Sequence, residues 1–179
     1  MRMWRHPGVR RRFARNQTGD LVGTSITVPV CRDTLPLLIN DPLCAPLLRA
    51  LWTPEQLAAL SATVDESEVY YAIALAYTSW NPEATRAALM RDWFGLYARG
   101  GMYLCTVSLP GWRRLLEAAG FQRVESARPD LWDLDGAGYV LDLRHRGVDG
   151  WIDSLIDNAG DELPPPAKVV AASDPDAAA

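Results

Sequence analysis

The sequence predicts a single α/β domain with a mixed, mostly antiparallel sheet, helices on both faces and one parallel strand–helix–strand crossover. Three observations predict this class. Apolar β-branched and aromatic runs alternate with segments of helical spacing. Proline and glycine residues mark the ends of these segments. A long apolar run is followed by a helix and a second apolar run, which requires a parallel crossover. The length of 179 residues suits one domain.

The first two strands are expected on either side of a tight turn. Residues 13–16 and residues 21–30 carry the apolar and β-branched side chains of strands, and Thr18, Gly19 and Asp20 between them supply the turn. Pro29 has no N–H group to donate to a ladder, so we expect it at a sheet edge or a bulge.

The next segment, residues 33–62, is rich in proline. Its first half should be irregular or broken into short turns. Thr53, Pro54 and Gln56 then form the pattern of a capping box with proline at the first helical position. We expect that helix to run to about residue 63.

Residues 68–79 form the most apolar and aromatic run of the chain, which predicts a central buried strand. Asn81 and Pro82 start a helix that should run to about residue 98, where Gly100 and Gly101 end it. The apolar positions expected on its packed face are Ala84, Ala87, Ala88, Phe94 and Tyr97.

The C-terminal part repeats the strand and helix pattern. We expect strands at 102–108, 121–127 and 139–144 and a helix at 110–119 ended by Gly120. A polar, Asp-rich loop should cover 128–137. A short helix at 148–158 should place three apolar side chains on one face: Trp151, Leu155 and Ile156.

Charge and composition predict three parts of the chain. These are a basic flexible arm at 1–11, the domain at 12–159 and a disordered Pro-, Ala- and Asp-rich tail at 160–179. The net charge is −4, yet six arginines fall in the first fifteen residues: Arg2, Arg5, Arg10, Arg11, Arg12 and Arg15. Such an arm can contact nucleic acid or an acidic partner. The alternative is a solvated terminus without a ligand.

Other classes of protein are disfavoured by what the chain lacks. No apolar run is long enough for a membrane span, and no signal peptide follows the basic start, so we expect a cytoplasmic protein with no membrane contact. The three cysteines have no metal-binding spacing and are expected in the core. His6 and His145 are isolated, and we expect no metal site.

The order of elements over residues 12–144 resembles the GNAT superfamily, the N-acetyltransferase fold. The likeness is carried by the hairpin RFARNQTGDLVG (12–23), the strand at 70–79, the junction RRLLEAAGF (113–121) and the closing strand YVLDL. The resemblance implies that acyl-CoA lies between two splayed strands and that a loop binds its pyrophosphate at a helix N-terminus. The cofactor-binding residues that it implies are Ala76, Tyr77, Thr78, Asn81, Ala84, Thr85 and Arg86.

The sequence departs from the family at these positions. The loop has no glycine, Pro82 removes one N–H donor, and Glu83 places a negative charge where an anion would bind. Leu116 stands where the family has a tyrosine. Acetyl-CoA is therefore possible but not required by the sequence, and residues 81–86 could equally be an ordinary capped helix start.

No catalytic residue is assigned from the sequence. Asp65, Glu66 and Glu68 could supply a general base or could form a solvated charged turn. Tyr103 could protonate a leaving thiolate or could simply pack in the sheet.

The resemblance also implies that the family's first strand and first two helices are lacking. We therefore expect an uncovered apolar surface that binds a second copy, as a homodimer, or a partner protein. The alternative is that residues 33–62 fold back and fill the gap. The candidate surface residues lie within 35–52 and include Leu35, Leu37, Leu38, Ile39, Leu43, Leu47 and Leu48.

Three function classes remain from the sequence. The first is an acyl-CoA-dependent N-acyltransferase with weak or lost activity. The second is a non-catalytic module that binds a partner or an effector; residues 111–122 with YVLDLR and GWIDSL resemble the GNAT-type module of bacterial ATPase and helix-turn-helix regulators. The third is a DNA-associated factor that uses its arginine-rich arm, although no recognition-helix pattern supports it.

Overall fold

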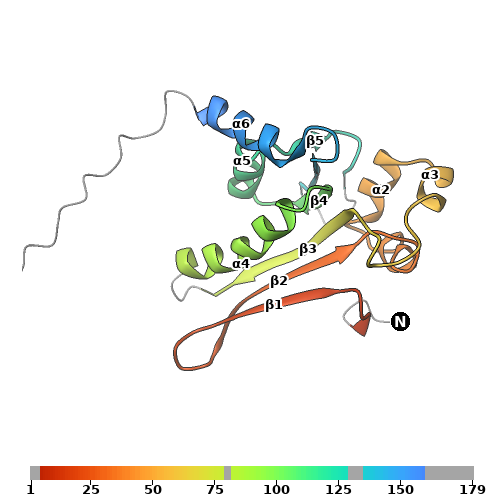
Figure 1. Cartoon of the computed structure of the whole chain (residues 1–179). Coiled ribbons are helices and arrows are strands. Elements are labelled where there is room, and N and C mark those ends of the chain that lie inside the picture. Colours follow the sequence, from red (N-terminus) through yellow and green to blue (C-terminus); the bar gives the residue numbers. More distant parts are fainter. Residues whose placement is uncertain (1–4, 79–81, 129–134, 160–179) are drawn as a thin grey trace, which may run out of the picture.

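A six-stranded mixed sheet forms the centre of the molecule (Figure 1). The computed structural model describes residues 5–78, 82–128 and 135–159. The strand order is β1-β2-β3-β4-β6-β5, and β3 and β4 are the parallel pair. The strands are β1 (Arg10–Arg15), β2 (Leu21–Pro29), β3 (Val69–Tyr77), β4 (Met102–Val107), β5 (Gln122–Val124) and β6 (Ala137–Asp142). The predicted fold class is confirmed.

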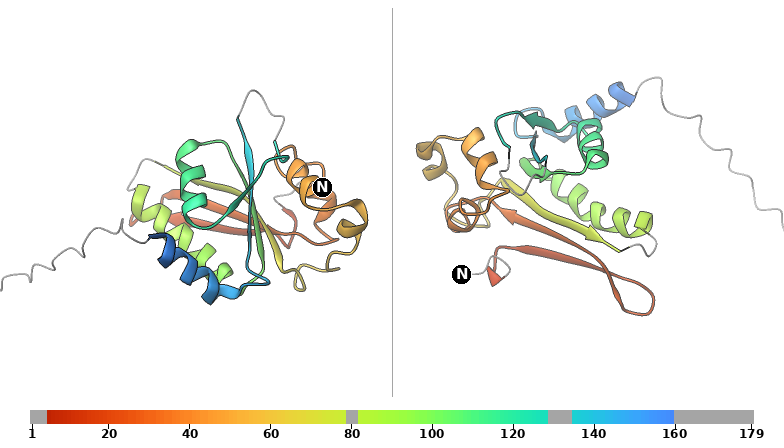
Figure 2. Two further views of the ribbon diagram at one scale, coloured as in Figure 1. Left: turned by 90° about the horizontal axis from the view of Figure 1, so that it is seen from above. Right: turned by 180° about the vertical axis from the view of Figure 1, so that it is seen from behind.

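Helices cover both faces of this sheet (Figure 2). The helices are α1 (Leu35–Leu38), α2 (Ala45–Leu51), α3 (Pro54–Ala58), α4 (Pro82–Tyr97), α5 (Pro110–Ala118) and α6 (Gly147–Ala159). One core lies under α1, α2 and α3 and contains Leu38, Leu48 and Tyr71. The other lies under α4, α5 and α6 and contains Trp93 and Trp151. No helix of the described segments is long and apolar enough to cross a membrane.

The N-terminal hairpin forms at the predicted turn. The Asn16 side-chain oxygen accepts hydrogen bonds from the backbone N–H groups of Thr18 and Asp20, at 3.1 and 2.8 Å. The arm predicted at 1–11 is shorter than expected, because β1 begins at Arg10 and Val9 is already buried in the core. Residues 1–4 lie outside the described part.

Pro29 lies at a local edge of the sheet, as expected, although its strand is internal. It ends β2, which is an internal strand between β1 and β3. The pairing of β1 with β2 reaches only as far as Thr27, so Pro29 lies past the end of the neighbouring strand and its missing N–H group breaks no bond to β1.

The proline-rich segment folds back onto the sheet. Leu38, Leu47 and Leu48 are fully buried, and Leu35 packs against the same core. Part of the apolar surface that we expected to bind a second copy is therefore covered by the chain itself, as in the alternative. Leu35, Leu37, Ile39 and Leu43 are half-buried, and a homodimer or a partner protein stays a prediction. The proline residues of 33–62 break this segment into short helices, which can follow the curvature of the sheet.

The capping box of α3 is confirmed, but the helix is shorter than predicted. The Thr53 side chain accepts from the Gln56 N–H, and the Gln56 side chain accepts from the Thr53 N–H. The helix ends at Ala58 and not near residue 63, because the chain must turn after the buried Leu57 to enter β3.

The bounds of α4 agree with the prediction, but of the residues expected on its packed face only Tyr97 is buried. Buried positions recur at helical spacing through Thr85, Leu89, Trp93, Leu96 and Tyr97. The predicted Ala84, Ala87, Ala88 and Phe94 are exposed.

Gly23 of β2 explains which face of α4 packs. A Cβ atom at this position would lie 2.7 Å from the Thr85 methyl carbon, so glycine lets the helix approach the strand closely. The contact turns Thr85 and Leu89 towards the sheet and leaves the alanines of α4 facing outwards.

Two C-terminal elements also differ from the expectation. The strand predicted at 121–127 has only three residues, because the chain turns after Val124. In α6, Trp151 is buried and Leu155 packs beside it, but Ile156 is 63% exposed. Five residues of α-helix rotate a side chain by about 140° from the starting face, so Ile156 cannot share the face of Trp151.

Gly101 should be more sensitive to substitution than its neighbour. Its φ is +112°, and a Cβ atom would lie 2.5 Å from the Glu68 carbonyl oxygen. Gly100 also has a positive φ, of +71°, but has open space around it. We expect Gly101→Ala to lower the free energy of unfolding by at least about 3 kcal/mol and Gly100→Ala by about 1 kcal/mol. Urea unfolding followed by tryptophan fluorescence measures both, and equal losses would contradict the clash.

Candidate functional site

The parallel strands β3 and β4 separate before they end. They pair over four positions, from Val69 with Met102 to Ala72 with Cys105. β3 then continues to Tyr77 and β4 to Val107 without pairing to each other. The diverging ends enclose a cleft of about 220 Å³. The predicted adjacent, then diverging, strands are confirmed.

The separation follows from the outer partners of the two strands. β3 stays paired with β2 as far as Tyr77, opposite Gly23. β4 stays paired with β6 as far as Val107, opposite Ala137. Because each strand keeps its own antiparallel neighbour, the sheet opens between them like a fork.

A tryptophan from α4 lies at the closed end of this fork. Trp93 lines the cleft, and its indole N–H donates a 2.7 Å hydrogen bond to the Ser25 hydroxyl of β2. The bond satisfies the buried indole donor and fixes the ring orientation. Ala72 and Cys105 complete this end with small side chains.

The polar groups of the cleft are few. The Thr106 hydroxyl donates to the Leu43 carbonyl at 2.9 Å and accepts from the Tyr71 hydroxyl at 3.3 Å. Burial, with a smaller effect of Cys44, raises the pKa of Tyr71, so its hydroxyl stays protonated. None of the described residues that line the cleft is a histidine, an aspartate or a glutamate.

A second hollow continues from the cleft between α4 and α5. The cleft and this second hollow share two lining residues, Leu109 and Trp112. The walls of this α4–α5 groove are mainly apolar, with Met90 and Phe94 on α4 and Leu115 on α5. Its charged residues are Glu83, Arg86 and Arg91.

The residues predicted to bind a cofactor are divided by the structure. Tyr77 and Arg86 line the α4–α5 groove. The Thr78 N–H donates to the Val22 carbonyl at 2.9 Å, so this amide is used within the sheet. Ala76 and Ala84 are exposed, and Thr85 is buried with its side chain against Gly23. Asn81 lies outside the described residues.

Sequence reasoning missed the β4 side of the cleft. Thr106, Trp112 and Leu116 line it, whereas the predicted residues all belong to β3, the start of α4 and the segment between them. The parallel crossover could have indicated these residues, because it places the C-terminal ends of both strands at one edge of the sheet. Leu116, which stands where the family has a tyrosine, is buried and lines the cleft.

The alternative catalytic candidates lie elsewhere. The Tyr103 hydroxyl is within hydrogen-bonding distance of the carbonyl groups of Leu96 and Gly100, beyond the end of the cleft. Tyr103 also stacks on Tyr70, with 5.6 Å between ring centroids, which is a packing role. Glu66 caps its own turn by accepting from the Thr63 N–H, at the opposite end of β3.

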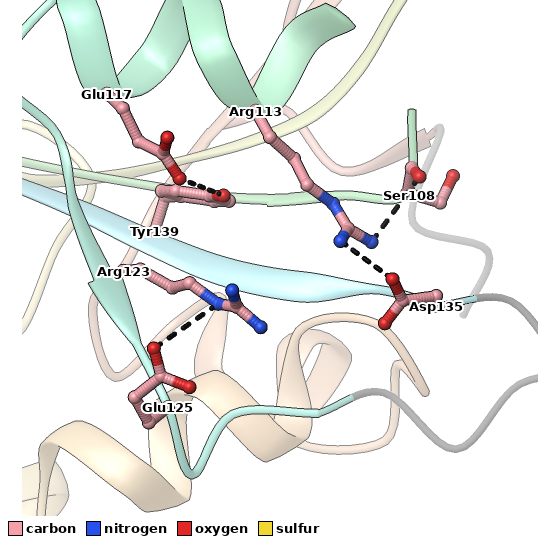
Figure 3. A network of polar contacts seen from close by, with 7 residues as sticks. All are labelled: Ser108, Arg113, Glu117, Arg123, Glu125, Asp135 and Tyr139. Carbon is pink, nitrogen blue, oxygen red and sulfur yellow. Dashed lines mark hydrogen bonds and ion pairs between the residues drawn. The ribbon is translucent and has the colours of Figure 1, made fainter. Parts of the chain in front are cut away.

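A network of ion pairs and hydrogen bonds lies beside α5 (Figure 3). Arg113 of α5 pairs with Asp135 at 2.8 Å and donates to the Ser108 carbonyl at 3.4 Å. The hydrogen bond from Arg113 lowers the pKa of Asp135. The Tyr139 hydroxyl donates to Glu117 at 2.9 Å. These contacts tie α5 to the end of β4 and to the start of β6, and no group of metal-ligating side chains occurs in the described segments.

Comparison with known proteins identifies the fold. No family model matches the chain, and no curated protein matches it. A CoA-dependent acyl-homoserine lactone synthase, BjaI, solved with SAM and isopentyl-CoA, is similar with a TM-score of 0.53 and 15% identity, over 87% of this chain and 68% of that one. The chain therefore has a GNAT-like fold, and the resemblance drawn from the sequence is confirmed for the fold.

Two further structures are similar at lower scores. A second CoA-dependent acyl-homoserine lactone synthase, MesI, has a TM-score of 0.48 and 16% identity, over 87% of this chain and 72% of that chain. A GCN5-related N-acetyltransferase from Kribbella flavida has a TM-score of 0.41 and 15% identity, over 78% of this chain and 70% of that chain.

Cys105 provides a test of the environment at the closed end of the cleft. Burial raises the pKa of this thiol to about 12, so roughly one molecule in 100,000 carries the reactive thiolate at neutral pH. We expect iodoacetamide to modify Cys105 far more slowly in the native protein than in urea. Peptide mass spectrometry separates it from Cys31 and Cys44, which are also buried. Equal native and unfolded rates at Cys105 would show that the cleft end is open to water.

Proposed function

We propose that this chain binds an acyl thioester of coenzyme A in the cleft between β3 and β4 and transfers the acyl group slowly or not at all. The observation that carries the proposal is the fork between the two strands, with apolar walls and a tryptophan at its closed end. The similar structure of BjaI, which was solved with isopentyl-CoA, supports a ligand of this class.

The cleft suits the pantetheine arm of such a ligand. Beyond Ala72, the edge of β3 that faces β4 has no strand partner within the described chain. An extended amide chain could pair with such an edge as a strand does. The side chains of Leu75, Val107 and Leu109 offer apolar contact along the same path.

The nucleotide part of coenzyme A would find fewer favourable contacts than the pantetheine arm. Arg86 and the N-terminal end of α4 favour an anion in the α4–α5 groove. Pro82 lacks one donor and Glu83 repels phosphate. The loss of an N–H donor and the added carboxylate each cost on the order of 1 kcal/mol, so binding should be at least about tenfold weaker than with a glycine-rich loop.

Acyl transfer needs groups that the cleft does not offer. A thioester supplies an activated carbonyl, and attack by an amine requires a base for the amine and an acid for the departing thiolate. None of the described lining residues is a carboxylate or an imidazole, and Leu116 has no proton to give. The Thr106 hydroxyl already donates its hydrogen to the Leu43 carbonyl.

The same deficit favours a second candidate, a non-catalytic module that binds a thioester as an effector. The two differ in one outcome, release of free thiol when an amine is added. A cytoplasmic location is part of both proposals and fits the three free, buried cysteines.

Calorimetric titration with acetyl-CoA tests the proposal. We expect a dissociation constant well above the micromolar range. Arg86→Ala should weaken binding several-fold, because it removes the phosphate-facing cation of the groove. Arg114→Ala is the matched control, since Arg114 is exposed on α5 and does not line the groove.

A submicromolar constant would contradict weak binding, and no heat at millimolar acetyl-CoA would contradict the assignment of the cleft. If Arg86→Ala and Arg114→Ala bind alike, Arg86 does not belong to the site.

A further inference from the structure

A groove outside the cleft is lined by arginines. We call it the arginine groove; it lies between β1 and α4 and has a volume of about 490 Å³. Arg10 and Arg12 come from β1, and Arg91 and Arg99 come from α4. Asp92 is the one acidic residue among the described groove residues. The other lining residues are apolar or small: Phe13, Ala14, Ala88, Leu89, Gly95 and Leu96.

Two of the arginines are held in place by neighbours. The Nε atom of Arg12 pairs with the Asp92 carboxylate at 2.9 Å, which leaves the two terminal nitrogens of the guanidinium to donate elsewhere. The guanidinium carbon of Arg10 lies 5.7 Å from the centroid of the Tyr70 ring. Both contacts turn the β1 arginines towards α4, so the cations converge on one hollow.

The charge of this groove is opposite to that of the chain. The whole protein carries −4, whereas the groove residues include four arginines and one aspartate. A concentration of cations in a concave surface attracts anionic partners and raises their rate of association. The ligand should therefore be acidic.

A second observation shows what shape the ligand should have. β1 is the outermost strand of the sheet and pairs only with β2 among the described strands (Figure 1). An edge strand presents backbone N–H and C=O groups that an extended peptide can pair with. Alternate side chains of an added strand lie about 6.7 Å apart on one face, the same spacing that separates Arg10 from Arg12 along β1.

We infer that the edge of β1 and the arginine groove together bind an extended acidic peptide segment of a partner protein. The segment adds to β1 as a further strand, and its carboxylates on one face pair with the groove arginines. This inference does not depend on the proposed function. Arg91 lines both grooves, but Arg10, Arg12 and Arg99 line the arginine groove and not the α4–α5 groove.

Other occupants fit less well. A second copy paired through β1 would bring arginine strands together, and like charges opposite each other destabilise a sheet. Single-stranded nucleic acid requires aromatic rings for its bases to stack on. Phe13 is the one aromatic residue among the described residues of the groove, so successive bases would have no row of rings to stack on.

Fluorescence anisotropy tests the inference with a short fluorescein-labelled peptide that alternates glutamate and threonine. We expect it to bind the full chain and to bind Arg99→Glu about tenfold more weakly, because a cation becomes an anion in the groove. The double variant R12E/R99E should lose more. Arg32→Glu, an exposed arginine outside the groove, is the control and should bind like the unmodified chain.

Strand addition has its own test. Methylation of alternate backbone nitrogens in the peptide removes the ladder donors and should weaken binding about tenfold or more. Equal binding of the methylated peptide, equal binding by Arg99→Glu, or no binding of the peptide to the unmodified chain would each overturn the inference. Tighter binding of an oligothymidylate than of the peptide would also overturn it. Acetyl-CoA affinity, measured on the same variants, should not change, which separates this site from the cleft.

Discussion

The structure depends on a conflict between strand partners in the middle of the sheet. β3 and β4 each have one antiparallel neighbour that holds them along nearly their full length, and the parallel ladder between them stops at Ala72 and Cys105. Antiparallel pairing is slightly more stable per residue than parallel pairing. When the twist of the sheet no longer permits both, the parallel contact is the one that is lost. The cleft is the direct product of that loss.

The other end of the same strand pair is locked by aromatic side chains. Tyr70 stacks on Tyr103, and Tyr97 contacts the rings of Tyr103, Phe121 and Trp151. Aromatic pairs of this kind add about 0.5–1.5 kcal/mol each beyond the area that they bury. These rings pack together at the closed end of the cleft, and the hydrogen bond between Trp93 and Ser25 completes the boundary.

Charge is distributed so that the two candidate surfaces differ in chemistry. The cleft is almost without ionisable groups, and burial keeps Tyr71 and Cys105 in their neutral forms. The arginine groove has the opposite character, with cations on both walls and the outermost strand of the described sheet beside them. α4 contributes to both surfaces, and Arg91 of this helix lines the arginine groove as well as the α4–α5 groove that continues from the cleft.

The sequence by itself determined the order of elements and most of their ends, because these depend on local chemistry. Asn16 and Gly19 make a turn, Thr53 and Gln56 close a capping box, and Gly100 and Gly101 end a helix wherever the chain places them.

Only the tertiary structure decided which side of each element packs and which residues meet. α4 buries Thr85 and Leu89 instead of its alanines because Gly23, some sixty residues earlier, admits it to the sheet. Leu38, Leu47 and Leu48 became core because the chain folds back over a face of the sheet that local sequence cannot describe. Thr106 reached Tyr71 and Leu43, and Arg12 reached Asp92, across long sequence separations. Such contacts depend on strand register and helix approach, which are set by the packing of the whole domain and not by any one segment.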